Sequence, residues 1–189
     1  QYLPRAKPDG YTVLLVLAAH AINDSLYPKL PYDTRKDFAP VSLVANLPMV
    51  VAASGKLPAR NMQELVQAAK AAPGKLTFGS AGNGNTGHLA AEYFSSIAGV
   101  KMTHVPYKGS AGVVNAMLAG DIDLTFDSIS TSMPHIRGGR MHALAVTSPQ
   151  RSALAPEVAT VQEQGIAGFD VTGWYALIAP AHHLRSPSA

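Results

Sequence analysis

Short apolar segments alternate regularly with helical ones through most of the second half of this sequence. Runs with the pattern of strands lie at 75–80, 101–107, 121–128 and 141–148. Between them the pattern predicts helices over 86–99 and 110–120 and a short helix over 133–139. Strands that alternate with helices of about 10 to 14 residues are typical of βαβ units and a mostly parallel sheet. The sequence therefore predicts an α/β fold.

The remaining apolar segments extend this pattern in both directions. Strands are predicted at 12–17, 41–47, 49–54 and 169–180, a helix at 61–72 and a short helix at 161–165. The run at 11–19 is the longest apolar one, and it is shorter than the ~20 residues that a membrane helix needs. We interpret it as a buried strand. No secretory signal precedes it, so we expect either that a signal has been removed or that the gene product starts elsewhere.

Composition excludes several classes of protein. With 47% hydrophobic and 14% charged residues among 189, the chain is expected to be globular rather than disordered. Its net charge of +3 is small and scattered, which argues against a nucleic-acid partner. Because it has no cysteine, disulfides, a thiol nucleophile and a zinc-thiolate site are excluded. No cofactor or metal is expected.

Two loops have the chemistry of an anion site. In open α/β sheets, ligands lie beyond the carboxyl ends of the strands, where loops lead into helix N-termini. One such loop lies within FGSAGNGNTGH (78–88), with Thr86 as the predicted N-cap of the next helix. The other precedes the helix at 110–120, with Ser110 as its predicted cap. The residues of the two loops are Ser80, Ala81, Gly82, Asn83, Gly84, Asn85, Thr86, Tyr107, Lys108, Gly109 and Ser110. Free N–H groups and helix dipoles there suit a carboxylate or a phosphate.

Three other interpretations of the first loop stay open at this point. Gly82-x-Gly84-x-x-Gly87 has the spacing of a dinucleotide-binding motif, but no acid follows the next strand, and only Lys108 is placed to meet a 2′-phosphate. Ser80 could belong to a nucleophile elbow, although Phe78 stands where that motif requires glycine. The loop could also be a tight turn without a ligand.

Histidine and aspartate supply the remaining candidates. The histidines have no metal-ligand spacing, and all except His88, in the first turn after the glycine loop, are assigned structural or solvated roles. Asp127 ends an apolar strand at the expected ligand edge. It is either a cap for the next turn or an acceptor for a ligand donor group.

A series of longer motifs runs through nearly the whole chain. They are PDGYT (8–12), LYPKLPYD (26–33), DFAPVSLVA (37–45), FGSAGNGNTGHLAAEYF (78–94), HVPYKGSAG (104–112), MPHIRGGRMHALAVTS (133–148) and TVQEQGIAGFDVTGWYALIAPA (160–181). Together they resemble the Bug family, the periplasmic solute-binding receptors of tripartite tricarboxylate transporters.

The resemblance implies a type II periplasmic-binding-protein fold, with two α/β lobes joined by crossing strands. Matching motifs place the second lobe at 52–172 and the first at 1–51 with 173–189. In the family, the loops corresponding to 80–86 and 107–110 grip carboxylate groups, and the acid corresponding to Asp127 meets an amino or hydroxyl group. The stretch that includes Ala19 and His20 contributes from the first lobe.

The family also implies a function and partners. The chain is expected to be a receptor without enzymatic activity that delivers a di- or tricarboxylate or an aromatic acid to membrane transporter subunits. The alternative is a nucleotide-dependent enzyme that uses the loop 82–87. Family members have further segments at both ends of the first lobe, so this lobe is expected to be incomplete and to be completed by dimerisation or domain swapping.

Overall fold

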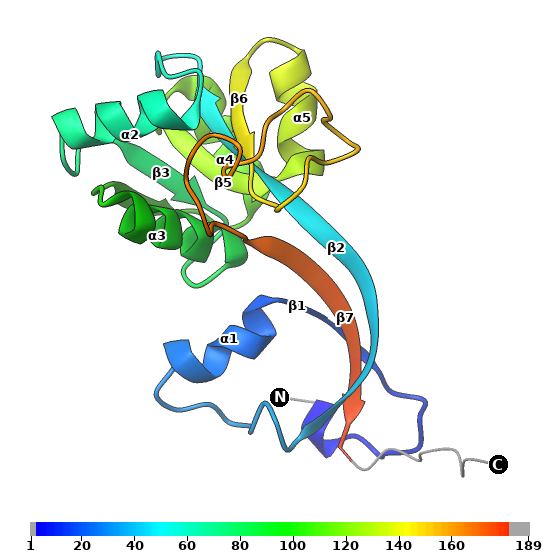
Figure 1. Cartoon of the computed structure of the whole chain (residues 1–189). Helices are drawn as coiled ribbons and strands as arrows, with labels where there is room; N and C mark the ends of the chain where they lie inside the picture. Colours follow the sequence, from blue (N-terminus) through cyan, green and yellow to red (C-terminus); the bar gives the residue numbers. More distant parts are fainter. Residues whose placement is uncertain (1–2, 182–189) are drawn as a thin grey trace. The chain divides into compact units, whose positions relative to one another are not determined.

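A computed structural model describes residues 3–181 of the chain (Figure 1). The chain divides into two compact units. The first comprises Gln1–Asn46 and Gly173–Ala189, and the second Leu47–Thr172. Strand β2 (Phe38–Ser54) begins in the first unit and ends in the second, and strand β7 (Thr172–Pro180) returns the chain to the first. In the described range, no helix has both the length and the apolar character to cross a membrane.

The second unit contains a sheet with the strand order β6-β2-β5-β3-β4. Strands β3 (Thr77–Ser80), β4 (Thr103–Pro106) and β5 (Leu124–Ser128) run parallel, as predicted for the strands that carry the two loops. Strand β2 pairs antiparallel with β5 and with β6 (Met141–Val146). The carboxyl ends of β3, β4 and β5 therefore lie on the same side of the sheet. The two loops start from the carboxyl ends of β3 and β4.

Helices cover both faces of this sheet. Along β2, Val51 and Ala53 pack into one core with helices α2 (Met62–Ala71) and α3 (Thr86–Ala98). Because side chains alternate along a strand, Val50 and Ala52 pack on the other face, with α4 (Ser110–Ala119) and α5 (Ile129–Arg137). The unit is thus a helix–sheet–helix sandwich, and its two cores fix where the helix N-termini lie.

Helix α3 buries a different stripe from the one that its large apolar residues indicate. Leu89, Tyr93 and Ile97 share a face in sequence, yet Tyr93 and Ile97 are exposed. The buried residues of α3 are Gly87, Ala90, Ala91 and Phe94. Small side chains let the helix approach the sheet so closely that a Cβ on Gly87 would lie 2.1 Å from the carbonyl oxygen of Phe126. The buried face of α3 is therefore the one on which small residues allow close contact with the sheet, and not the one with the most large apolar side chains.

The first unit has a small core. Strand β1 (Leu14–Leu17) pairs antiparallel with β7, which lies next to β2. Leu3, Val16 and Ile178 are buried together, with Phe38 and Trp174 packed against them. The strand predicted at 12–17 is present as β1, but the prediction that it is buried is wrong. Leu14, Leu15 and Leu17 are 44%, 52% and 51% exposed, and within β1 only Val16 is buried.

Three predicted elements differ from the structure. The strands predicted at 41–47 and 49–54 are one strand, β2, because the φ angle of proline is compatible with the extended backbone at Pro48. The helix predicted at 161–165 is a series of turns. The N–H of Gly165 donates to the carbonyl of Gln162, three residues back, and that of Ile166 to the carbonyl of Val161, five residues back, so the α-helical spacing of four is not formed here. Helix α1 (Ala19–Leu26) was not predicted from the sequence.

Candidate anion site at two helix N-termini

The first loop connects Ser80, the last residue of β3, to helix α3. The side chain of Asn85 caps this helix, with Oδ1 accepting the N–H of His88 at 2.8 Å. The prediction that Thr86 is the N-cap is therefore wrong by one residue. Asparagine and threonine are both good caps, and the residue whose backbone remains extended takes the position. Here that residue is Asn85, with φ −71° and ψ 165°.

Three of the loop's backbone donors already have partners. The N–H of Gly82 donates to Ser80 Oγ (3.3 Å), that of Gly84 to His88 Nδ1 (3.1 Å) and that of Asn85 to the carbonyl of Gly82 (3.3 Å). Within residues 3–181, the N–H groups of Asn83, Thr86 and Gly87 have no protein acceptor. The first donors of a helix have no internal partner, so these groups are the ones that an anion would engage.

Two stacked imidazole rings hydrogen-bond to residues of the first loop. The rings of His88 and His104 lie 3.9 Å apart at 18°, and Phe78 stacks on His104 at 4.9 Å. His104 Nε2 and Ser80 Oγ share a hydrogen bond of 2.7 Å, and Ser80 is buried. Burial lowers the pKa of His104, and the nearby His88 lowers it further. A neutral His104 therefore holds Ser80. Nδ1 of His88 accepts the N–H of Gly84.

The second loop lies directly beside the first. The N–H of Tyr107 donates to the carbonyl of Ser80 (2.9 Å), and that of Gly109 donates to the carbonyl of Ala81 (3.1 Å). Gly109, at φ +93°, is the N-cap residue of α4, and no side chain caps this helix. The prediction of a Ser110 cap is therefore wrong, and the N-terminus of α4 keeps its donors open. Lys108, at the tip of the loop, is exposed.

Ser110 instead donates its hydroxyl hydrogen to Asp127 Oδ1 at 2.9 Å. Asp127 Oδ2 is buried and has no partner among the described residues. Burial raises the pKa of Asp127, while hydrogen bonds from the Ser128 backbone and the Ser110 hydroxyl partly offset the rise. Asp127 caps no helix, because the N-cap residue of α5 is Ser128 and no side chain caps that helix. The interpretation of Asp127 as a cap is therefore wrong, and its role as an acceptor for a ligand stays a prediction.

Ala19 and His20 lie in the first unit, in the first turn of α1. The His20 ring packs edge-on to Phe38 at 5.0 Å and stacks on Tyr32 at 6.0 Å. Burial lowers the pKa of His20, and the charge of Asp24 opposes this. The assignment of Ala19 and His20 to the ligand site rests on the family resemblance and stays a prediction.

The sequence pattern placed His104 on a strand and predicted a structural or solvated role for it, and the structural role is confirmed by its hydrogen bond to Ser80. Sequence reasoning did not identify Ser80 as its partner. The signal lies in the parallel register, which sets Phe78 opposite His104 and Ser80 opposite Pro106.

The other histidines lie elsewhere. His135 is on α5 and His142 on β6, while His182 and His183 fall outside the described residues. In the described part of the chain, no three His, Asp or Glu residues form a group that could hold a metal ion.

The lowered pKa of His104 predicts a pH-dependent stability. Its folded pKa lies below the ordinary value of about 6.5, so the folded protein binds fewer protons than the unfolded one in mildly acidic solution. Stability from this group is fully present above about pH 6.5 and is lost as the pH falls toward the folded pKa. We expect the urea midpoint of the wild type to fall between about pH 7 and pH 5.

The variant His104→Gln isolates this contribution, because His20 and His142 also have lowered pKa values. Glutamine keeps a hydrogen-bonding group near Ser80 but does not titrate. The fall in the urea midpoint should be shallower in His104→Gln than in the wild type. An equal fall in both proteins would show that His104 is not responsible.

Comparison with known proteins identifies the family. The model of the tripartite tricarboxylate transporter family receptor matches residues 1–185. The chain belongs to this receptor family. A family relative from Pseudomonas sp. (strain P51), a UPF0065 protein in the tcbD-tcbE intergenic region, is 38% identical over 183 residues, which cover 96% of this chain and 54% of that protein.

Solved structures of family members share the two-lobe α/β fold. An R. palustris protein solved with adipate is 33% identical with a TM-score of 0.89, covering 97% of this chain and 62% of that one. The periplasmic binding protein BugD is 34% identical with a TM-score of 0.86, over 97% and 61%. MatC of Rhodopseudomonas palustris, with bound malate, is 28% identical with a TM-score of 0.85, over 97% and 63%. The resemblance to Bug receptors is thereby confirmed, and the chain spans a little more than half the length of these relatives.

Proposed function

We propose that this chain is part of an extracytoplasmic solute-binding receptor that captures a small organic acid with two or more carboxylates. One observation carries the proposal. Two helix N-termini, those of α3 and α4, follow adjacent parallel strands, and hydrogen bonds from Tyr107 and Gly109 join their loops. Their unpaired N–H groups are suited to oxygen anions, and each helix dipole adds roughly 0.3 to 1 kcal/mol for a carboxylate at its N-terminus. The family members solved with adipate and malate support this class of ligand.

Asp127 gives the site a means of choosing among acids. Its unpartnered Oδ2 would be left buried and unsatisfied beside an acid that lacks a donor, and an unmet buried polar atom is costly. A hydroxyl or amino group on the ligand can hydrogen-bond to it. We therefore propose that the receptor distinguishes hydroxy or amino diacids from simple ones through Asp127, with Ser110 orienting the carboxyl group.

We propose no catalytic activity for this site. Two of the glycines that suggested a dinucleotide motif are explained by the fold itself. Gly84 adopts φ +74°, and Gly87 packs against the backbone of Phe126, where a side chain would not fit. Ser80 is buried, and its hydroxyl bonds to both the N–H and the carbonyl of Gly82 within the loop, so it is not exposed to a substrate as a nucleophile would be. A receptor returns its ligand unchanged, whereas the alternative, a nucleotide-dependent enzyme, would convert it.

The family supplies the proposed partners and location. As a member of the tripartite tricarboxylate transporter receptors, the protein would work in the periplasm and pass its ligand to membrane transporter subunits. The first unit leaves large apolar side chains exposed, among them Val41 at 50% and Leu43 at 60%. Completion of this unit by dimerisation or a domain swap stays a prediction, which sedimentation velocity at increasing concentration would test.

Amide NMR tests the proposal on this chain, even if its affinity is low. We expect malate and adipate, at up to millimolar concentrations, to shift the amide resonances of Asn83 in the first loop, of Thr86 and Gly87 in α3, and of the first turn of α4. NAD should leave these resonances unchanged. Ligand recovered after prolonged incubation should be chemically intact. Shifts confined to other parts of the chain, or conversion of the ligand, would overturn the proposal.

A further inference from the structure

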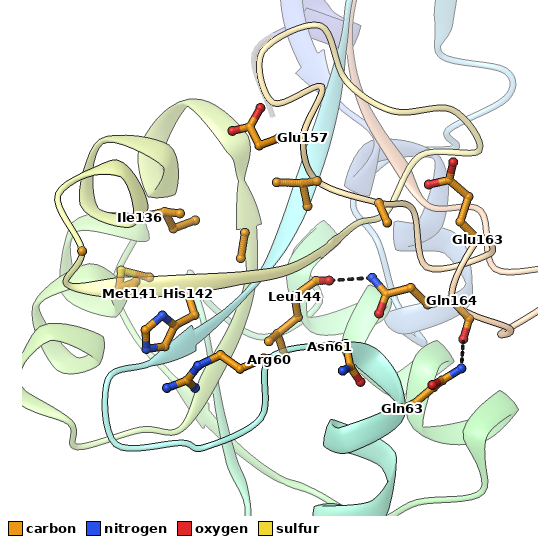
Figure 2. A pocket seen from close by; sticks show the side chains of 14 residues that line it. Arg60, Asn61, Gln63, Ile136, Met141, His142, Leu144, Glu157, Glu163 and Gln164 are labelled. Carbon is orange, nitrogen blue, oxygen red and sulfur yellow. Dashed lines mark hydrogen bonds between the residues drawn. The ribbon is translucent and has the colours of Figure 1, made fainter.

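A cavity with a volume of about 720 Å³ lies in the second unit, apart from the two loops (Figure 2). Its walls come from the start of α2, the end of α5, the first residues of β6 and the segment 157–164. The size falls within the range of about 300 to 1,000 Å³ that is common for ligand sites. None of the residues of the two loops lines it.

Strand register places this cavity near the ends of the strands that lie away from the two loops. Met49 of β2 pairs with Ser128, at the carboxyl end of β5 where the loops gather. Ser54, at the other end of β2, pairs with Met141, which lines the cavity. The cavity is therefore separate from the proposed carboxylate site, and an occupant here would not compete with a ligand there.

One wall of the cavity is a free strand edge. Strand β6 pairs with β2 on one side. On its other side Val146 bonds to the segment 159–161, and the side chain of Gln164 donates to the carbonyl of Leu144 at 2.6 Å. From Met141 to Ala143, no described strand pairs with the outer edge. A free edge presents backbone N–H and C=O groups that an extended chain can pair with.

The cavity has positive and negative groups on opposite walls, as Figure 2 shows. Arg60 is held in place by two hydrogen bonds from Nη1, to the carbonyls of Leu57 (2.9 Å) and Ala59 (3.1 Å). It lies beside His142, and neither forms an ion pair in the described part of the chain. Glu157 stands on the opposite wall, also without an ion pair there.

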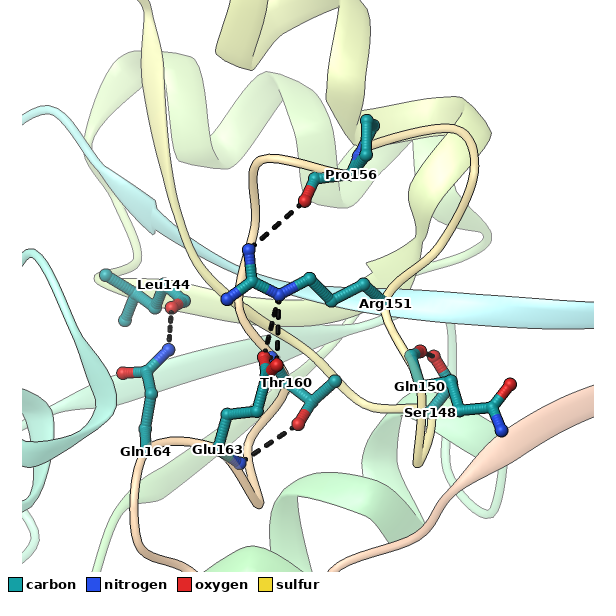
Figure 3. A network of polar contacts seen from close by, with 8 residues as sticks. All are labelled: Leu144, Ser148, Gln150, Arg151, Pro156, Thr160, Glu163 and Gln164. Carbon is teal, nitrogen blue, oxygen red and sulfur yellow. Dashed lines mark hydrogen bonds and ion pairs between the residues drawn. The ribbon is translucent and has the colours of Figure 1, made fainter.

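Polar contacts hold the segment 157–164 in a defined conformation (Figure 3). Arg151 Nε donates to both carboxylate oxygens of Glu163, at 2.9 and 3.1 Å, and Arg151 Nη1 donates to the carbonyl of Pro156 at 3.2 Å. The same carboxylate accepts the N–H of Thr160 at 2.7 Å. Gln164 also ties this segment to α2, because its Oε1 accepts the N–H of Met62 at 2.7 Å. The cavity is thus formed before anything binds.

We propose that this cavity binds an extended peptide segment of a partner protein, which pairs with the free edge of β6 and places an acidic side chain at Arg60 and His142 and a basic one toward Glu157. Strand addition of this kind takes its affinity from backbone hydrogen bonds and its specificity from side-chain pockets. A small anion would use Arg60 alone and would leave both the strand edge and Glu157 without a partner. The proposal does not depend on the carboxylate site.

Fluorescence anisotropy on the whole chain tests this. The probe is a fluorescein-labelled hexapeptide of alternating threonine and valine, in which one residue is replaced by glutamate and another, two positions on, by lysine. We expect saturable binding, and Arg60→Gln should weaken it about tenfold, since the variant removes a charged partner for the glutamate of the peptide. The matched control Lys75→Gln removes the same charge from an exposed residue outside the cavity and should change the affinity less than about twofold.

Two N-methylated versions of the peptide separate strand pairing from ionic attraction. Alternate N–H groups of a strand point to the same edge, so methylation of one alternate set should abolish binding and methylation of the other should leave it intact. Absence of saturable binding to the wild type, equal binding of the two methylated peptides, or full displacement of the probe by free glutarate would each overturn the proposal.

Discussion

Replacing Gly84 with valine is expected to weaken dicarboxylate binding at least tenfold while the sheet of the second unit stays folded. Gly84 adopts φ +74°, a conformation that a β-branched residue rarely takes. Its N–H bonds to His88 Nδ1, so a changed backbone at Gly84 would also release the imidazole that holds the loop. The free backbone N–H groups of Asn83 and Thr86 would then no longer point toward the same ligand oxygen. Loss of one hydrogen bond to a charged oxygen costs about 1.5 to 3 kcal/mol. A tenfold loss of affinity corresponds to about 1.4 kcal/mol, so the loss of one such bond is enough.

Gly74→Val is the matched control. Gly74 has the same φ of +74°, and an added Cβ would meet nothing within 4 Å. It lies in the turn before β3, at the end of that strand away from the loops, and its N–H bonds to the carbonyl of Lys101. Both variants should lose similar stability in urea, because both strain the backbone, and only Gly84→Val should lose affinity for malate or adipate in a calorimetric titration. If Gly84→Val binds as the wild type does, the loop is only a turn and the carboxylate site is elsewhere.

The largest loss of stability is expected for Gly87→Ala. A Cβ on this residue would lie 2.1 Å from the carbonyl oxygen of Phe126, and that atom belongs to the backbone of a central strand. Alanine in a helix is ordinarily better than glycine by about 1 kcal/mol, so the local effect alone would stabilise the protein. The clash outweighs it, because α3 must move away from the sheet and the packing of Phe94 and Phe126 is disturbed. We expect the free energy of unfolding to fall by roughly 3 kcal/mol.

Gly55→Ala provides the comparison for this prediction. Its added Cβ would lie 3.8 Å from the carbonyl oxygen of Arg140, an ordinary contact, and its φ is not in the left-handed region. Equilibrium urea unfolding should place Gly55→Ala close to the wild type and Gly87→Ala far below it. A Gly87→Ala protein as stable as the wild type would mean that α3 does not pack as closely as described.

Local sequence patterns determined much of the second unit. The alternation of strands and helices predicted β3 through β6 and helices α2, α3 and α4, and the short helix predicted at 133–139 is the end of α5. Hydrophobic period and turn residues act over a few neighbours, so they can be read from one sequence. The same reasoning located both loops, since a glycine-rich stretch between a strand and a helix identifies a helix N-terminus. Long ordered motifs, from PDGYT to the last APA, identified the receptor family.

Tertiary structure alone decided how the side chains of the site are used. Ser110 was expected to cap its own helix, but Asp127, distant in sequence, is close enough to accept its hydroxyl hydrogen. His104 supports Ser80 because the register of two parallel strands sets them together, and register depends on pairing between segments rather than on either segment. Likewise, β1 is apolar like a buried strand, yet its exposure depends on which elements cover it. A single sequence specifies each segment's preference, whereas contacts between segments are decided only when the whole chain packs.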